Sequence, residues 1–128
     1  MQEKFKNLPL RIGVGIILLN KDNKVFVAKR LDNPNNYWQM PQGGIEQGEN
    51  PLVAGLREME EEIGTKNVEY LDEINSWLNY DIPSNLSEKL WNGKYRGQTQ
   101  KWLAYRFLGN NDEINIKTKN PEFIDWKW

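Results

Sequence analysis

The stretch that decides the fold of this chain is Gly43-Gly44-Ile45-Glu46-Gln47-Gly48-Glu49, followed by residues 51–64 with Arg57-Glu58-Met59-Glu60-Glu61-Glu62 at their centre. A glycine turn thus comes directly before a helix in which carboxylates cluster. Glycine lets a ligand approach the backbone, and carboxylates hold divalent cations. The stretch therefore has the parts that a site for metal and polyphosphate needs.

The sequence predicts an α-helix over residues 51–63. Asn50 is a good N-cap, Pro51 suits the first helical position, and Gly64 suits the position just past the end. At about 100° per residue, the apolar side chains of the helix share an arc of about 60°. We expect this arc to be the buried face, and its members are Leu52, Leu56, Met59 and Ile63.

Three carboxylates, those of Glu58, Glu61 and Glu62, share a second arc of about 100° on the same helix. Like charges at this spacing destabilise a helix by about 0.2–0.5 kcal/mol per pair, so a compensating cation is expected. A solvated acidic face is the commoner reading of a Glu-rich helix taken alone. The loop Pro41-Gln42-Gly43-Gly44, placed directly before the helix, favours the metal site instead.

The whole stretch resembles the signature of the Nudix hydrolases. The signature is Gly43, five residues, Glu49, seven residues, Arg57-Glu58, an apolar residue, any residue, Glu61-Glu62, any residue and Gly64. So many fixed identities at fixed spacing make a chance match very improbable. Thr65 departs from the pattern, because the family usually has an aliphatic residue there.

This resemblance implies an α/β fold, in which a mixed sheet is sandwiched between helices (α/β/α) and a loop-helix-loop segment carries the motif. It also implies hydrolysis of a nucleoside diphosphate linked to another group. The residues that it implies to be catalytic are Glu58, Glu61, Glu62 and Arg57, and Glu49 helps Arg57 to orient the loop. The expected cofactor is Mg²⁺ or Mn²⁺, with the three glutamates and the Gly43 carbonyl as ligands.

Further segments resemble a bacterial branch of the family, which comprises RNA 5′-pyrophosphohydrolases and dinucleoside polyphosphate hydrolases. They are residues 38–44, 77–80, 97–102, 121–123 and 126–128, so the similarity runs from Arg11 to Trp128. In that branch the glutamate of Pro121-Glu122-Phe123 is a further metal ligand. Read alone, Glu122 would be an exposed loop acid.

Basic, amide and aromatic residues match the substrate positions of the same branch. Arginine suits phosphate because its planar fork binds two oxygens at once, and a tyrosine can stack on a base. The expected substrate-binding residues are Arg11, Lys29, Arg30, Gln39, Tyr80, Gln98, Gln100 and Lys101. Lys94 and Arg96, together with Lys101, would favour an RNA exit groove if they line one, although surface charges of this kind are usually only solvated.

Composition limits the remaining possibilities. The 128 residues form one domain, whose net charge of −1 gives no general attraction to nucleic acid. The chain has no Cys, no membrane-length apolar run and a polar start over residues 1–9, so we expect a cytoplasmic protein. It also has no His, so its general base is expected to be a clustered carboxylate or a metal-held hydroxide.

Periodicity and turn residues predict the other elements. Residues 11–19 and 25–29 read as two strands of a hairpin, and residues 68–77, 99–108 and 123–128 read as further strands. Residues 81–97 read as a long loop with one helical turn near residues 87–91.

The sequence therefore predicts a hydrolase that removes pyrophosphate from the 5′-triphosphate end of RNA. Hydrolysis of diadenosine tetra- or pentaphosphate is the close alternative, and a non-catalytic nucleotide- or RNA-binding module is a third reading. Family members usually continue past residues 126–128 into a further strand and helix, so the chain is either truncated or a minimal member. The sequence leaves any protein partners open.

Overall fold

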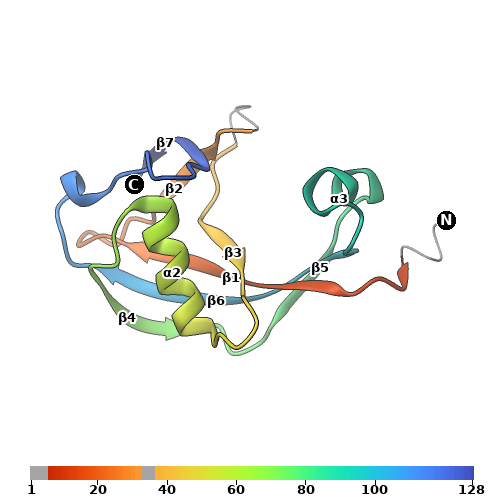
Figure 1. Ribbon diagram of the computed structural model, residues 1–128. Coiled ribbons are helices and arrows are strands. Elements are labelled where there is room, and N and C mark those ends of the chain that lie inside the picture. The colour runs from red at the N-terminus through yellow and green to blue at the C-terminus, as the bar shows by residue number, and fades with distance from the viewer. Residues whose placement is uncertain (1–5, 33–36) are drawn as a thin grey trace.

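A computed structural model describes residues 6–32 and 37–128 (Figure 1). Residues 1–5, part of the polar start, lie outside the described residues, as do residues 33–36. The elements in chain order are β1 (Leu10–Leu19), β2 (Val27–Arg30), β3 (Gln42–Gly44), α2 (Pro51–Ile63), β4 (Val68–Glu73), β5 (Leu78–Asp81), α3 (Ser84–Trp91), β6 (Gly97–Phe107), a 3₁₀ turn (Asn111–Glu113) and β7 (Phe123–Lys127).

A mixed sheet is built around the long strand β6. Its order is β3-β1-β6-β4, and β5 pairs with the other end of β6. β1 and β6 run parallel, with Leu10 opposite Gly97 and Leu19 opposite Arg106, whereas β3, β4 and β5 are antiparallel to their neighbours. This register places Arg11 beside Gln98, which brings two of the predicted substrate residues together.

The two strands of the predicted hairpin pair only next to the turn that joins them. Leu19 bridges to Val25, but β2 then leaves the main sheet and pairs with β7 (Figure 1). Aromatic packing accounts for this, because the fully buried ring of Phe26 stacks on Trp126 at 5.4 Å between centroids. Trp128 contacts the same ring edge-on at 6.0 Å.

The helix α2 begins and ends where the sequence predicts. The side chain of Asn50 accepts a hydrogen bond from the Val53 amide at 2.9 Å, and Gly64 adopts the left-handed conformation with φ of 76°. Side-chain and backbone caps therefore fix both ends.

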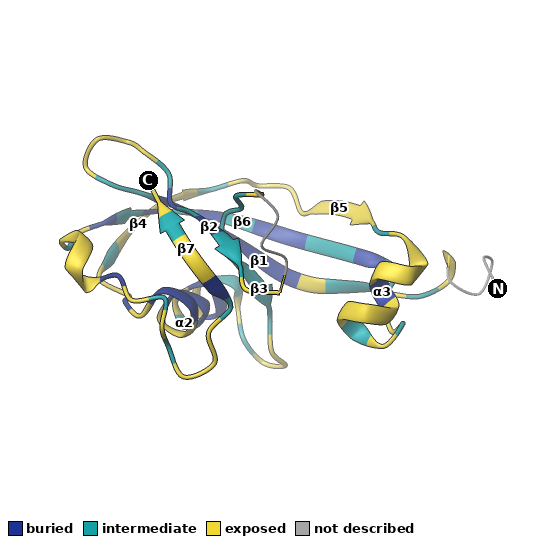
Figure 2. Cartoon of the chain, turned by 90° about the horizontal axis from the view of Figure 1, so that it is seen from above, coloured by how far each residue is buried: buried dark blue, intermediate teal, exposed yellow. Residues whose placement is uncertain are grey.

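The buried face of α2 is only partly the predicted one, since Met59 and Ile63 are buried but the two leucines are not. Leu52 and Leu56 are 42% and 37% exposed, whereas the buried residues are Ala54, Gly55, Glu58, Met59, Glu62 and Ile63. Gly55 lets the helix approach the sheet, because a Cβ at this position would lie 2.6 Å from the Tyr105 hydroxyl. Two glutamates of the predicted ligand face, Glu58 and Glu62, are buried as well, and part of α2 carries the colour of buried residues in Figure 2.

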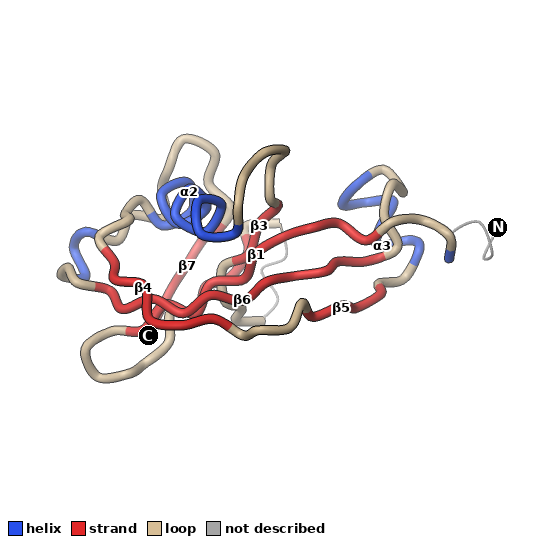
Figure 3. Tube along the Cα trace, turned by 90° about the horizontal axis from the view of Figure 1, so that it is seen from below, coloured by secondary structure: helices blue, strands red, loops and turns tan. Residues whose placement is uncertain are grey.

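The segment predicted as a long loop contains more structure than one helical turn. α3 extends from Ser84 to Trp91, and a short strand, β5, precedes it. Both lie at one end of the molecule, away from α2 (Figure 3). The strands predicted at residues 68–77, 99–108 and 123–128 are confirmed with shifted ends, at residues 68–73, 97–107 and 123–127. Among the described helices, none is long and apolar enough to cross a membrane.

Gly55→Val tests the close approach of α2 to the sheet. We expect it to lower the free energy of unfolding by about 1–3 kcal/mol, since the added side chain meets Tyr105 and Leu103. Glu60→Val is the matched control, because it places the same residue at an exposed position of the helix and should cost about 0.5 kcal/mol or less. Urea unfolding followed by circular dichroism measures both. Equal losses would contradict the packing described.

Candidate metal and phosphate site

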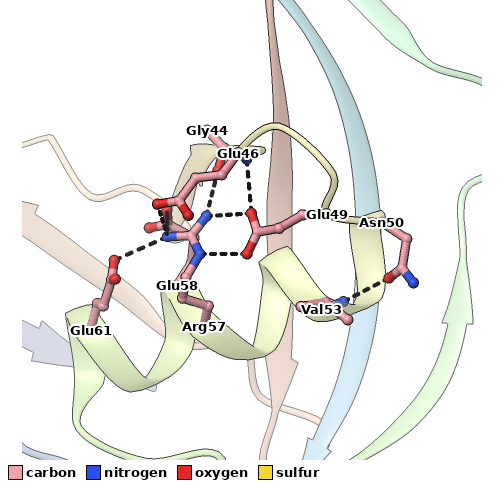
Figure 4. A network of polar contacts seen from close by, with 8 residues as sticks. All are labelled: Gly44, Glu46, Glu49, Asn50, Val53, Arg57, Glu58 and Glu61. Atoms are coloured by element: carbon pink, nitrogen blue, oxygen red, sulfur yellow. Dashed lines mark hydrogen bonds and ion pairs between the residues drawn. The ribbon is translucent and has the colours of Figure 1, made fainter.

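The guanidinium of Arg57 joins the glycine loop to α2 (Figure 4). Its Nε donates to Glu49 Oε2 at 2.7 Å, and one terminal nitrogen donates both to Glu49 Oε1 at 2.9 Å and to the Gly44 carbonyl at 2.8 Å. The hydrogen bonds from Arg57, with a further one from the Glu46 amide, lower the pKa of Glu49 to about 2. Glu49 is therefore ionised at neutral pH, and the loop is held in one position.

The second terminal nitrogen of Arg57 faces two other glutamates. It donates to Glu58 Oε1 at 2.9 Å and to Glu61 Oε2 at 3.2 Å. Glu61 is largely exposed, whereas Glu58 is buried. The Arg57 guanidinium thus orients three carboxylates, two from the helix and one from the loop.

Glu58 lies directly against the backbone of Gly43. A side chain at residue 43 would overlap the Glu58 carboxylate, so only glycine fits there. Burial raises the pKa of Glu58 to about 7, although the bond from Arg57 opposes this shift.

Glu62 is the most buried glutamate of the motif, with a residue exposure of 2%. Within the described residues, neither of its carboxylate oxygens has a hydrogen-bond partner. Burial first, and the neighbouring carboxyl of Glu122 second, raise its pKa to about 11. The backbone carbonyl of Glu122 accepts from the Leu31 amide at 2.7 Å, which fixes this acid after the long β6–β7 connection.

These residues fit a divalent cation. Unpartnered carboxylate oxygens, buried beside two further acids, are hard ligands that lack a counter-charge. In residues 6–32 and 37–128, no three acids are already gathered around one point as ligands, and Arg57 holds Glu58 and Glu61. A cation would therefore have to draw these side chains a short way from their present contacts.

A cleft of about 830 Å³ lies beside the carboxylates. Seven predicted site residues line it, namely Arg11, Arg30, Gln39, Gly43, Glu58, Gln98 and Glu122. A second cleft, of about 700 Å³, is lined by Arg57 and Glu61 and shares Arg11 and Glu58 with the first. Arg11, Gly44 and Glu58 thus line both clefts.

Amide side chains and Tyr80 form a hydrogen-bonded group, of which Gln42 and Gln98 line the larger cleft and Tyr80 and Gln100 line neither cleft. The Tyr80 hydroxyl donates to Gln100 Oε1 at 2.7 Å and accepts from Gln98 Nε2 at 3.3 Å. Gln100 in turn donates to Gln42 Oε1 at 2.6 Å, and Arg11 donates to Gln98 Oε1 at 3.3 Å. Tyr80 and Gln100 therefore act within this group, and the hydroxyl of Tyr80 is already engaged.

Two predicted substrate residues lie elsewhere. Lys101 is buried, pairs with Glu73 at 2.9 Å and donates to the Asn75 carbonyl at the same distance. The Lys29 ammonium lies 4.8 Å from the ring centre of Trp38. Neither lines the clefts described above, because adjacent residues of a strand point to opposite faces.

Arg96, a candidate for an exit groove, lies 3.6 Å from Asp81 and lines neither cleft.

The sequence interpretation missed other residues that line the larger cleft. They are Asp32, Gln42 and, from α3, Leu86, Lys89, Leu90 and Trp91. The spacing of Leu86, Lys89 and Leu90 at i, i+3 and i+4 was the available signal, since it marks one face of a helix.

The chain is similar to one family along almost its whole length. A family model described as NUDIX domain matches residues 9–128. A protein of Pelagibacter ubique (strain HTCC1062) named RNA pyrophosphohydrolase is 59% identical over 128 residues, covering all of this chain and 81% of that protein. A protein of the same name from Rickettsia typhi is 54% identical over 125 residues, covering 98% of this chain and 78% of that protein.

Solved structures show the same architecture at lower identity. The E. coli dihydroneopterin triphosphate pyrophosphohydrolase has a TM-score of 0.69 at 20% identity, covering 94% of this chain and 82% of that one. A C. elegans Ap4A hydrolase in a binary complex has a TM-score of 0.66 at 20% identity, covering 93% and 79%. At this identity the likeness concerns the fold alone.

Glu62→Gln tests the burial of an acid that has no hydrogen-bond partner among the described residues. Because the folded-state pKa of Glu62 lies near 11, well above the ordinary 4.5, the folded protein keeps a proton that the unfolded chain releases. In chelator, the wild type should therefore lose stability relative to Glu62→Gln as pH rises from about 5 to 8. Thermal unfolding at both pH values measures the difference.

The control for this comparison is Glu60→Gln, an exposed glutamate of the same helix. Its difference from the wild type should stay constant with pH. Added Mg²⁺ or Mn²⁺ should raise the melting temperature of the wild type and of Glu60→Gln, and raise that of Glu62→Gln much less. A pH-independent gap between Glu62→Gln and wild type would contradict the burial of an unpaired acid.

Proposed function

The chain belongs to the Nudix family, and from this premise we propose that it removes pyrophosphate from the 5′-triphosphate end of RNA. Water would cleave the bond between the α-phosphorus and the oxygen that bridges the α- and β-phosphates, giving a 5′-monophosphate and pyrophosphate. The observation that carries the proposal is the buried pair of Glu58 and Glu62 beside a cleft that Arg11 and Arg30 line. Relatives more than half identical bear the name RNA pyrophosphohydrolase, which supports the same reaction.

Members of this family typically depend on a divalent metal. We propose that Glu58, Glu61, Glu62, Glu122 and the Gly43 carbonyl hold Mg²⁺ or Mn²⁺. When bound, such an ion neutralises phosphate charge and acidifies a water molecule. Arg57 keeps two of these carboxylates and the glycine loop in place, so its role is positioning.

The arginines of the cleft would bind the phosphates. Arg11 lines both clefts, and its guanidinium already turns toward an amide oxygen of Gln98. Arg30 is held by Asp32, with nitrogen–oxygen distances of 2.7 and 2.8 Å, so that its fork is oriented before substrate arrives. Gln39 and Gln98 line the same cleft and present amide groups to the first nucleotide.

The chain has no His, so the proton acceptor would be a carboxylate of the cluster or a metal-held hydroxide. Burial raises the pKa of Glu58 in the metal-free protein, and a bound cation would lower it again. Because these acids interact, each observed pKa is a property of the whole cluster and not of one glutamate.

Glu61→Gln and Glu62→Gln should each lower kcat by orders of magnitude while the fold persists, because each removes negative charge from the proposed metal site. Glu60→Gln, on an exposed part of the same helix, should retain activity within about twofold. Steady-state release of pyrophosphate from 5′-triphosphorylated RNA measures the effect. Near-wild-type turnover in both active-site variants would refute the site.

The choice of substrate needs a separate experiment. We expect kcat/KM to be higher for 5′-triphosphorylated RNA than for diadenosine tetraphosphate, with Mg²⁺ and with Mn²⁺. A large preference for the dinucleotide would favour the alternative hydrolase. Nucleotide binding without turnover of either substrate would favour a non-catalytic module.

A further inference from the structure

We propose that Gln100 is a positioning residue, which turns the side-chain amide nitrogen of Gln42 toward the larger cleft. This role rests on the function proposed above. Gln100 is fully buried on β6 and lines neither cleft, whereas Gln42 lies on β3 and lines the larger one. The strand β1 lies between β6 and β3 in the sheet, so any link between the two glutamines has to cross it.

Two glycines of β1 let the Gln100 side chain reach Gln42. Gly13 is opposite Gln100 of β6. Two residues further along, Gly15 is opposite Gln42 of β3, so these positions all face the same side of the sheet. A Cβ at Gly13 would lie 2.6 Å from the Gly43 carbonyl oxygen. Because β1 has no side chain at either position, the Gln100 amide crosses the strand and donates to Gln42 Oε1 at 2.6 Å.

Arg11 sets the direction of the hydrogen bonds in this group. A guanidinium can only donate, so the side-chain oxygen of Gln98 turns to Arg11 and the Gln98 nitrogen donates to the Tyr80 hydroxyl, each at 3.3 Å. The Tyr80 hydroxyl then donates to Gln100 Oε1 at 2.7 Å, which leaves the Gln100 nitrogen to donate to Gln42. The oxygen of Gln42 is thereby used inside the group.

This order of bonds leaves the amide nitrogen of Gln42 as the group that it can offer to a substrate. Arg11 and Arg30 line the same cleft, so we expect the substrate to be anionic there and to favour donors. An amide turned the other way would present its oxygen to the phosphates and weaken binding. Gln100 thus selects, from inside the sheet, which end of Gln42 the substrate meets.

Gln100→Glu and Gln100→Met test this role at about pH 8.5, where a carboxyl is ionised. A carboxylate at residue 100 still accepts from Tyr80 but cannot donate to Gln42, so it should turn the Gln42 amide around. We expect kcat/KM for 5′-triphosphorylated RNA to fall about tenfold or more with Glu and about three- to tenfold with Met, mainly through KM. The Mg²⁺ concentration for half-maximal activity should stay the same, and a larger requirement would contradict this role.

A comparison of double and single variants isolates the orientation of Gln42. In the wild-type background Gln42→Ala should lower kcat/KM, because it removes a donor. In the Gln100→Glu background the same change should raise kcat/KM, because it removes a misplaced oxygen. Phe107→Leu, a change in the buried core of the same strand, is the control for lost stability and should keep kcat/KM within about twofold.

Hydrogen exchange of the side-chain amides, followed by NMR in the wild type, tests the orientation without variants or turnover. The Gln100 amide should exchange slowly, because its nitrogen donates to both Gln42 and Gln98. The Gln42 amide should exchange rapidly, since only its oxygen is bonded inside the group.

Equal losses from Gln42→Ala in both backgrounds overturn the role of Gln100 and leave the proposed function intact. A Gln42 amide that exchanges as slowly as that of Gln100 does the same. A wild type that releases no pyrophosphate from RNA overturns the proposed function instead, and amide exchange then still decides the orientation of Gln42.

Discussion

The bidentate ion pair between the Arg57 guanidinium and the Glu49 carboxylate is the interaction on which the remainder of the site depends. Two hydrogen bonds, at 2.7 and 2.9 Å, clamp the helix to the loop that precedes it, and the same guanidinium reaches Gly44, Glu58 and Glu61. Lysine has a single ammonium and lacks the planar fork that serves so many partners at once. The clamp thus adds to the β1–β3 pairing and the packing of α2 in keeping the Gly43 backbone against the Glu58 carboxylate.

The clamp matters because the acids that it serves are costly to bury. Glu58 and Glu62 are taken from water next to Glu122, and burial raises the pKa of both well above that of a free glutamate. A protein selected for stability alone would fill this region with apolar side chains. The fold instead keeps buried acids that can ionise for a cation beside a cleft whose arginines attract anions, and cations and phosphates fit such an arrangement together.

Local rules predicted the helix well, and long-range packing explains the errors. The ends of α2 depend on Asn50 and Gly64 alone, and the Nudix fold with its mixed sheet is confirmed. Half of the predicted buried face of α2 is confirmed. The prediction was wrong for Leu52 and Leu56, because hydrophobic periodicity gives weight to large apolar side chains, whereas the small residues Ala54 and Gly55 are the buried ones. Lys101 follows two predicted substrate residues in the sequence, but the alternation of side chains along a strand places it on the other face, where it pairs with Glu73. The length of α3 was predicted too short, because this helix buries almost no apolar side chain that would mark it in the sequence.

The parallel pairing of β1 with β6 has a consequence for how the molecule comes into being. Arg11 and Gln98 are neighbours in space but are 87 residues apart in the chain, and Glu122 arrives later still. Closing such a loop is slow, since the chain loses conformational entropy before the contacts between its ends lower the free energy. During synthesis the acidic helix is complete long before its partners emerge from the ribosome. The acids of α2 therefore stay exposed in the nascent chain until β6 and the segment around Glu122 have been synthesised.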